Sequence, residues 1–444
     1  RFFLVLGAII VVLVLGEFSA VIGGIGSTML VVLGGLVVVD ILLLWLVGRS
    51  GSSDGEQRVL PVEGEREMAD RLSNGDLNDI RLRLRNRYPF PLRAIVIDEI
   101  PPQFQVRNAS YRVKVPSGEE RTLRYRLRPV RRGLYDFGTI NLFARSPLGL
   151  VQRRFRLDAG RSVPVYPSYI QMRRYRLMAE ANRLAEIGIR RVRRVGQTME
   201  FDQIREYVAG DDYRTINWKA TARRPGNLMV NQDQDERSQA IYSIIDKGRT
   251  MQMPFEEMTL LDYSINAALV LSNIALMKQD RAGLVTYADT VEEFLVANRR
   301  PVQMQRIVET LYNQSTRFPE SDDEALSTAA RRRVNGRSLL LLFTNIETLA
   351  ALHRRLPALR ALARGHLLVV VLFENTELRD RLTSRPRTSE EVAIKSVVER
   401  FVWEKRQIVG ELKRHGIMAI HTSPENLTAA TINTYLEIKA RRLV

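Results

Sequence analysis

A carboxylate and a hydroxyl residue stand where a run of apolar residues ends, in the second half of the chain. Residues 240–246 predict a buried strand that ends on Asp246, and Gly248 and Thr250 follow in a polar turn. Ligands of α/β sheets bind beyond the carboxyl ends of strands, and hard cations such as Mg²⁺ prefer oxygen ligands. The junction is therefore a candidate cation site, although Gly248 offers no side-chain oxygen.

The segment that must position this junction, residues 240–444, alternates strand and helix patterns. Apolar runs predict strands at 240–246, 283–287, 291–295, 338–344, 367–373 and 417–421. Longer amphipathic stretches predict helices at 256–277, 302–312, 322–333, 390–414 and 427–441. Continuous apolar strands flanked by helices indicate a mostly parallel sheet buried on both faces. We expect a C-terminal α/β, Rossmann-like domain.

Two apolar runs open the chain, at residues 2–15 and 28–47. The second run is 20 residues long, enough to cross a bilayer core of about 30 Å. No Lys or Arg lies between the runs, whereas Arg49 and Arg58 follow the second. The positive-inside rule therefore predicts a transmembrane helical hairpin over residues 1–48, with the rest of the chain in the cytoplasm. A signal peptide is the rival interpretation for the first run alone.

Asp40 lies inside the second apolar run. An ionised carboxylate in a bilayer costs about 2.5–3.5 kcal/mol if it is unpaired, so Asp40 needs a partner or a wet environment. One interpretation is that Asp40 lies near the membrane–water interface or is protonated. The other is that it faces another helix in a homo-oligomer.

The middle of the chain changes composition twice. Residues 49–61 are rich in Gly, Ser, Asp and Glu and predict a flexible linker. Residues 62–168 alternate apolar and polar positions, as in Ile80-Arg81-Leu82-Arg83. This alternation over short segments predicts an antiparallel, Ig-like β-sandwich. Residues 169–239 form an Arg-rich connector, whose arginines are either solvated or in contact with anionic lipid.

Composition narrows the classes of function. The 444 residues carry a net charge of +17. They include no cysteine, which excludes thiolate metal sites and a Cys nucleophile. No Walker A motif, His-Glu-x-x-His or dinucleotide fingerprint is present. The positive charge reflects either genome composition or an anionic partner. Aromatic residues make up 7% and do not interleave with the arginine clusters, which argues against nucleic-acid binding.

The residues just before the α/β segment carry a resemblance. Residues 204–223 read IREYVAGDDYRTINWKATAR. This block resembles the signature of the bacterial family named domain of unknown function 58, whose members are related to von Willebrand factor A domains. The order of apolar hairpin, β-rich region, block and A-type domain is also that of the family. The resemblance implies an adaptor or co-chaperone of a MoxR-type AAA+ ATPase that is anchored in a bacterial inner membrane, with no enzymatic activity and no cofactor.

Within the block, polar and aromatic residues either fasten the connector to the A-type domain or form a recognition surface for a partner. These residues are Arg205, Tyr207, Gly210, Asp211, Asp212, Arg214, Trp218 and Lys219. The alternative function is a metal-assisted hydrolase that uses Asp246 with Asp211 or Asp212.

A-type domains that bind Mg²⁺ gather an Asp-x-Ser-x-Ser motif, a distant Thr and a further Asp. By this resemblance, the degenerate site here would comprise Asp246, Thr250, Ser321 and Asn345. Gly248 replaces one hydroxyl and Asn345 replaces one carboxylate, so we expect Mg²⁺ binding to be weak or absent. The expected role of this edge is docking with little dependence on metal.

Overall fold

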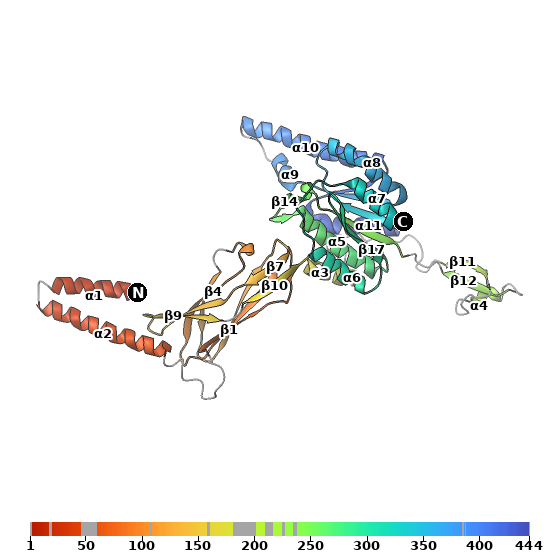
Figure 1. Cartoon of the computed structure of the whole chain (residues 1–444). Helices are drawn as coiled ribbons and strands as arrows, with labels where there is room; N and C mark the ends of the chain where they lie inside the picture. The colour runs from red at the N-terminus through yellow and green to blue at the C-terminus, as the bar shows by residue number, and fades with distance from the viewer. Residues whose placement is uncertain are drawn as a thin grey trace. The chain divides into compact units, whose positions relative to one another are not determined.

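The computed structural model describes residues 2–16, 20–45, 60–106, 109–157, 160–180, 201–208, 216–223, 227–233, 238–383, 386 and 388–443 (Figure 1). The chain divides into two compact units, Arg1–Tyr166 and Pro167–Val444. The first holds two apolar helices and a β domain, and the second holds an α/β domain.

Helices α1 (Phe2–Gly16) and α2 (Ala20–Trp45) are apolar on nearly every face and pack against each other. The approach is close at Gly26, where a Cβ atom would lie 2.8 Å from Leu13 Cδ2. The stretch Val21–Trp45 is long and apolar enough to cross a membrane. The other described helix that meets this test, α5 (Leu260–Met277), is 83% buried and belongs to a core. Helix α2 starts at Ala20 rather than at residue 28, because glycine is well tolerated in closely packed apolar helices.

Among the described residues of the β domain, ten strands form three sheets, ordered β1-β3-β6, β2-β10-β7 and β5-β4-β8-β9, which confirms the predicted β-sandwich region. Nearly all neighbouring strands are antiparallel, the pair β2 and β10 being parallel. The strands are β1 (Val62–Glu67), β2 (Leu72–Ser73), β3 (Asn78–Asn86), β4 (Leu92–Asp98), β5 (Ser110–Val115), β6 (Glu120–Leu127), β7 (Gly133–Phe137), β8 (Ile140–Arg145), β9 (Gln152–Leu157) and β10 (Arg161–Tyr166).

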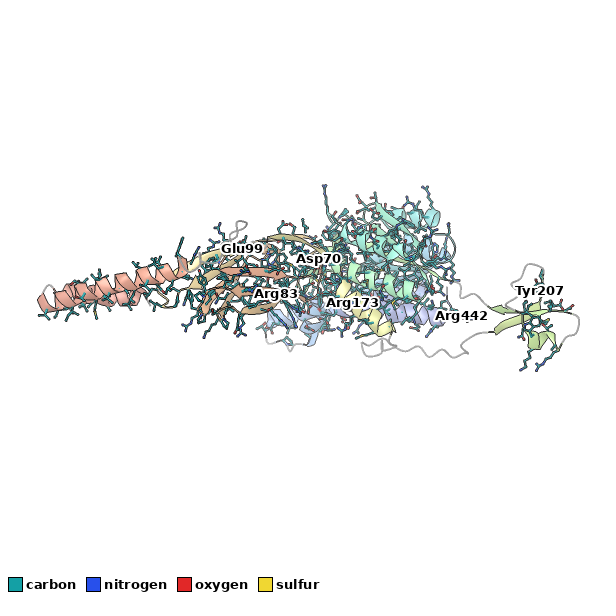
Figure 2. The ribbon with its side chains drawn as sticks, turned by 90° about the horizontal axis from the view of Figure 1, so that it is seen from below. Asp70, Arg83, Glu99, Arg173, Tyr207 and Arg442 are labelled. Atoms are coloured by element: carbon teal, nitrogen blue, oxygen red, sulfur yellow. The ribbon has the colours of Figure 1, made fainter. Side chains whose placement is uncertain are left out.

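Strand β3 shows how the sequence builds this domain. Its residues alternate strictly between buried and exposed, because side chains point to opposite faces along a strand. Ile80, Leu82 and Leu84 are fully buried, and the arginines between them face solvent. Arg83 pairs with Glu67 on the surface at 2.5 Å (Figure 2). The arginines of this strand therefore form a solvated surface.

The predicted connector has more structure than a linker. Helix α3 (Tyr169–Glu180) packs on α5, with Tyr175 buried in the core of the α/β domain. The backbone N–H of Ser168 donates to Asn266 Oδ1 at 2.9 Å, which holds the start of α3 to α5. The connector prediction therefore differs from the structure over these residues. The arginine clusters at 190–194 lie outside the described residues.

The described part of the signature block begins in the first strand of a small hairpin and continues toward the second. Strands β11 (Phe201–Glu206) and β12 (Met229–Asp233) pair antiparallel, and helix α4 (Trp218–Thr221) lies between them in the chain. Asn217 begins α4, because its side-chain oxygen accepts from the N–H of Ala220 at 3.0 Å.

The α/β domain is built on a six-stranded sheet ordered β17-β16-β13-β18-β19-β20. All neighbours are parallel except β16 and β17, which confirms the predicted mostly parallel sheet. The strands are β13 (Ala240–Asp246), β16 (Arg281–Tyr287), β17 (Val291–Asn298), β18 (Leu339–Phe343), β19 (Leu367–Phe373) and β20 (Met418–Thr422). The remaining helices are α6 (Val302–Tyr312), α7 (Asp323–Arg333), α8 (Leu349–Gly365), α9 (Thr376–Thr383), α10 (Ser389–Arg414) and α11 (Leu427–Ala440).

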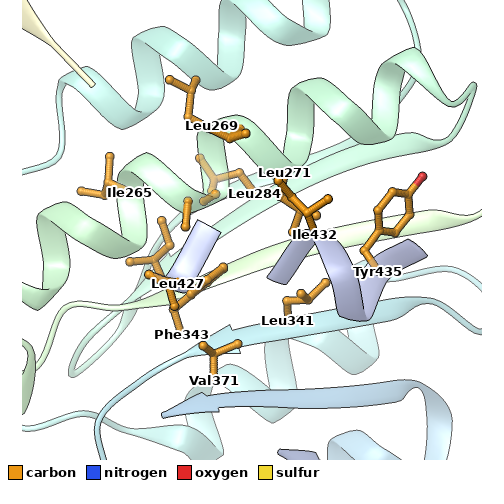
Figure 3. Close-up of a cluster of buried hydrophobic side chains, with 14 of the residues drawn as sticks. Ile265, Leu269, Leu271, Leu284, Leu341, Phe343, Val371, Leu427, Ile432 and Tyr435 are labelled. Carbon is orange, nitrogen blue, oxygen red and sulfur yellow. The ribbon is translucent and has the colours of Figure 1, made fainter. Parts of the chain in front are cut away.

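Helices cover both faces of this sheet. On one face, α5 and α11 pack over alternate strand residues such as Leu341 and Phe343 (Figure 3). On the other face, residues of α7, α8 and α10 pack over the intervening positions, such as Leu340 and Leu342. Burial on both faces explains why the strands read as continuous apolar runs.

Two differences from the predicted elements bear on the site. Helices α8 and α9 were not predicted, and α8 carries Pro357 in its interior. Helix α5 begins at Leu260 rather than at residue 256, because β14 (Pro254–Phe255) and β15 (Met258–Thr259) form a short hairpin before it. The Thr259 side chain then caps α5 by accepting from the N–H of Asp262.

Candidate functional site

Asp246 ends the central strand β13, which lies between β16 and β18. The chain leaves β13 through α5 to β16 on one side and reaches β18, on the other side, only later. This reversal is the topological switch point at which α/β sheets bind ligands. Asp246 is fully buried there. The structure thus places the predicted carboxylate at the expected edge of the sheet.

Internal donors take up both oxygens of the Asp246 carboxylate. Oδ1 accepts from the N–H of Gly248 at 2.8 Å and from the hydroxyl of Ser321 at 2.5 Å. Oδ2 accepts from the hydroxyl of Thr344 at 2.6 Å and from Nη2 of Arg355 at 3.2 Å. Four donors match the roughly four acceptor positions of a carboxylate. The group is therefore a saturated structural acceptor.

Arg355, from helix α8, joins this carboxylate to a second one. Its guanidinium forms an ion pair with Asp323, with Nη2 2.9 Å from Oδ1. It also donates to the hydroxyl of Tyr287 at 3.1 Å and to the hydroxyl of Thr344 at 3.0 Å. Burial by itself lowers the pKa of Arg355. The surrounding oxygens of Tyr287, Asp323 and Asp246 raise the pKa by more than burial lowers it, so the net shift is upward. The guanidinium therefore stays charged.

Tyr287 completes the cluster as a neutral donor. Burial, followed by the charges of Asp246 and Asp323, raises the pKa of its hydroxyl well above the ordinary value of 10.0. The protonated hydroxyl donates to Asp323 Oδ1 at 2.8 Å. Asp246, Ser321, Thr344, Arg355, Asp323 and Tyr287 are called the arginine cluster below.

The predicted metal ligands only partly come together. Of the predicted ligands, Asp246 and Ser321 come together, and the Ser321 hydroxyl donates to Asp246 Oδ1. Thr250 lies in the 3-10 helix η5 (Arg249–Gln252), and the hydrogen bonds to Asp246 from the described part of the chain do not include it. Asn345 accepts from Nζ of Lys405 at 2.6 Å instead, and its neighbour Thr344 reaches the carboxylate.

The residues present do not fit a resident Mg²⁺ ion. Oδ2 of Asp246 already binds a guanidinium, whose positive charge would repel a second cation. Within the described ranges, no group of three or more His, Cys, Asp and Glu side chains is arranged to hold a metal. The first Ser of the metal-binding motif cannot be accommodated at position 248 unless neighbouring atoms move, because its Cβ would lie 1.9 Å from Ser321 Oγ.

Sequence reasoning missed Arg355 because helix α8 was not predicted; once the helix is known, its spacing places residue 355 on the buried face. Position 355 lies three residues after Leu352 and four before Leu359, on the same face of a helix, and both leucines are fully buried. Arg354 falls off that face. The Arg354 side chain is accordingly 75% exposed and that of Arg355 only 16%.

Lys405 of α10 is a second partly buried cation at this edge. Its Nζ donates to Asn345 Oδ1 and, at 2.7 Å, to the carbonyl of Ile346. Burial lowers the pKa of Lys405 to about 8, against the opposing charge of Glu347. Lys405 thereby ties α10 to the segment that follows β18.

The signature block is described only in part. Gly210, Asp211, Asp212 and Arg214, together with the side chain of Arg205, lie outside the described residues. The N–H of Tyr207 donates to the carbonyl of Leu228 at 2.8 Å, continuing the β11–β12 hairpin (Figure 2). Trp218 and Lys219 are exposed, Trp218 to 69%.

Asp40 has partners within its own unit. Its fully buried carboxylate accepts from the hydroxyl of Ser146, and from the N–H groups of Leu148 at 3.3 Å and Leu150 at 3.0 Å. These donors belong to the loop between β8 and β9, residues 146–151, called the Asp40 loop below. The loop supplies the partner that was expected from another helix or from solvent.

The end of helix α2 is held in the same way. The carbonyl of Leu44 accepts from the hydroxyl of Tyr88 and from Nη1 of Arg153, each at 2.8 Å. A cation at the carboxyl end of a helix also complements its dipole. Residues 20–39 precede these contacts and measure about 30 Å at 1.5 Å per residue, which matches a bilayer core.

Part of the chain is similar to known proteins. Residues 203–381 match the family described as "Protein of unknown function DUF58". "Uncharacterized protein YeaD" of Bacillus subtilis (strain 168) is 28% identical over 203 residues, which cover 44% of this chain and 49% of that protein. The chain thus spans about half the length of the curated relative it matches.

Two solved structures are each similar to part of the chain. The conserved hypothetical protein BatB from Bacteroides thetaiotaomicron is 13% identical, with a TM-score of 0.31, and covers 46% of this chain and 99% of its own. The CARDB domain of a Pyrococcus furiosus protein is 18% identical, with a TM-score of 0.19, and covers 26% of this chain and 99% of its own. The family resemblance thus rests on residues 203–381, which are similar to the DUF58 proteins of unknown function.

Proposed function

We propose that this chain is a membrane-anchored interaction protein that docks a MoxR-type AAA+ ATPase at the carboxyl edge of its von Willebrand factor A-like domain. The observation that carries the proposal is the saturated carboxylate of Asp246, whose oxygens are all held by internal donors. A general base or a metal ligand needs a free lone pair. The switch point therefore supports a rigid docking edge better than a hydrolase that uses Asp246.

Helix α10 supplies a surface at this edge. Lys405 contacts the residues just after β18, so the turns of α10 before it extend past the edge of the sheet (Figure 1). These turns expose large apolar side chains, and such patches on a folded domain mark interaction sites. The exposed residues are Val392, Ile394, Val397, Phe401 and Trp403.

The α1–α2 hairpin would place this edge in the cytoplasm of a bacterial cell. The proposal rests on the apolar length of α2 and on Arg49 and Arg58, which follow it in the sequence. Protease added to right-side-out spheroplasts should leave the β domain and the α/β domain intact, and cleavage of either would contradict this orientation.

A pull-down of the detergent-solubilised full chain, with ATP and with or without Mg²⁺, tests the docking role. The chain should recover an AAA+ ATPase, and the double variant Phe401→Ser/Trp403→Ser should lose most of it. Val296→Ser is the matched control, because Val296 is exposed on β17, the opposite edge strand of the sheet. Equal recovery by both variants, or no ATPase recovered by the wild type, would contradict the proposal.

A further inference from the structure

The arginine cluster surrounds one guanidinium with oxygen atoms from four residues. Asp246 Oδ2, Thr344 Oγ1, Tyr287 OH and both oxygens of Asp323 all lie within hydrogen-bond distance of Arg355 nitrogens. Two of these residues are carboxylates and two carry neutral hydroxyls. An oxygen-only set with two carboxylates is what Mg²⁺ and Mn²⁺ select.

The charge of this cluster depends on Arg355. The side chains of Asp246 and Asp323 are 0% and 4% exposed, and buried carboxylates are stable only when they are paired. Among the ion pairs of the described residues, Arg355 is the cation bound to both. One positive charge thus compensates two negative ones, and the cluster keeps a net negative charge.

A guanidinium and a metal ion cannot share these oxygens. The planar fork of Arg355 bridges Asp246 and Asp323 and leaves no free position on Asp246 Oδ2. A divalent ion would need the same carboxylate oxygens at about 2.1 Å. Occupancy by one cation therefore excludes the other.

We propose that the arginine cluster is a divalent-cation site masked by Arg355, so that the side chain acts as the resident cation of this edge. The intact chain then keeps the edge ordered without any divalent ion. Removal of Arg355 opens the site to Mn²⁺ or Mg²⁺, with Asp246, Asp323 and Thr344 as ligands. One consequence rests on the proposed docking function: partner binding itself needs no metal at this edge.

Purified full-length protein in detergent, without any partner, provides the test, so its outcome is independent of the docking proposal. Arg355→Ala is compared with Arg354→Ala, its neighbour on α8, whose exposed side chain makes only a long surface ion pair with Glu320 (3.7 Å). Mn²⁺ binding is measured by electron paramagnetic resonance, and thermal unfolding is followed in EDTA and in excess Mn²⁺.

The wild type and Arg354→Ala should show no Mn²⁺ binding that depends on Asp246 and no Mn²⁺-dependent change in Tm. Arg355→Ala should unfold at a lower temperature in EDTA and recover several degrees in Mn²⁺, because a ligand that binds only the folded state stabilises it. The additional change Asp246→Asn should abolish that recovery. A variant that folds only with Mn²⁺ would also support the proposal.

Folded Arg355→Ala that binds no Mn²⁺ would overturn the masked site. If that variant does not fold under either condition, the wild type decides the matter. Micromolar Mn²⁺ binding by the wild type that is lost in Asp246→Asn would show that Arg355 does not exclude the ion, whereas its absence would support exclusion.

Discussion

Replacing Asp40 by Asn should loosen the Asp40 loop. The carboxylate accepts from the Ser146 hydroxyl and from the N–H groups of Leu148 and Leu150. An amide of the same size keeps one acceptor oxygen and turns a donor toward the remaining N–H or hydroxyl. Leaving a buried donor unpaired costs about 1–3 kcal/mol.

Hydrogen exchange of the loop amides measures this loss directly, because local opening sets their exchange rate. A loss of about 1–3 kcal/mol corresponds to roughly 5- to 150-fold faster exchange at Leu148 and Leu150. The assay is exchange mass spectrometry on peptides that contain residues 146–151, with the full chain in detergent.

Two further variants isolate the cause. Ser146→Ala removes one donor, but the Asp40 carboxylate still accepts from both N–H groups. The increase in exchange rate should therefore be smaller than in Asp40→Asn. Ser27→Ala is the control on the same helix, since the Ser27 hydroxyl donates only locally, to the carbonyl of Gly24 at 2.9 Å. Unchanged exchange at Leu148 and Leu150 in a folded Asp40→Asn protein would refute the reasoning.

Two more predictions concern the edge of the α/β domain. Gly248→Ser should destabilise the fold by about 1–3 kcal/mol in chemical denaturation, because the added Cβ would lie 1.9 Å from Ser321 Oγ. Gly365→Ala, where nothing lies within 4 Å, should be nearly neutral, and equal stability of both variants would contradict the packing described. Burial lowers the pKa of Lys405 from 10.5 to about 8, so the folded state binds fewer protons than the unfolded state between these values. The unfolding free energy should therefore rise as pH increases from about 8 to 10.5, and this gain should be lost again as pH falls to about 8. Denaturation of Lys405→Met at a series of pH values should show a flatter slope over this range. A slope equal to that of the wild type would contradict the assignment.

Local patterns predicted the elements best where burial is uniform. Residues 240–246 were predicted as a strand and are β13, because every side chain of that run is buried on one face or the other. Strand β3 followed from strict alternation for the same kind of reason. Helix α8 was missed, since paired arginines and Pro357 interrupt its apolar spacing. Its helical state depends on packing against α7 and the sheet, which a short window of sequence does not contain.

The sequence by itself determined the classes of element, the position of Asp246 at a strand end, and the apolar length of α2. The tertiary structure alone decided which partners the buried charges have. Arg355 meets Asp246 across 109 positions of the chain, and Ser146 meets Asp40 across 106. Periodicity reports only neighbours along the backbone, whereas the partner of a buried carboxylate depends on the order of strands and the path of loops. For that reason the sequence did not reveal that Asp246 meets Arg355, or that Asp40 meets a loop of the β domain.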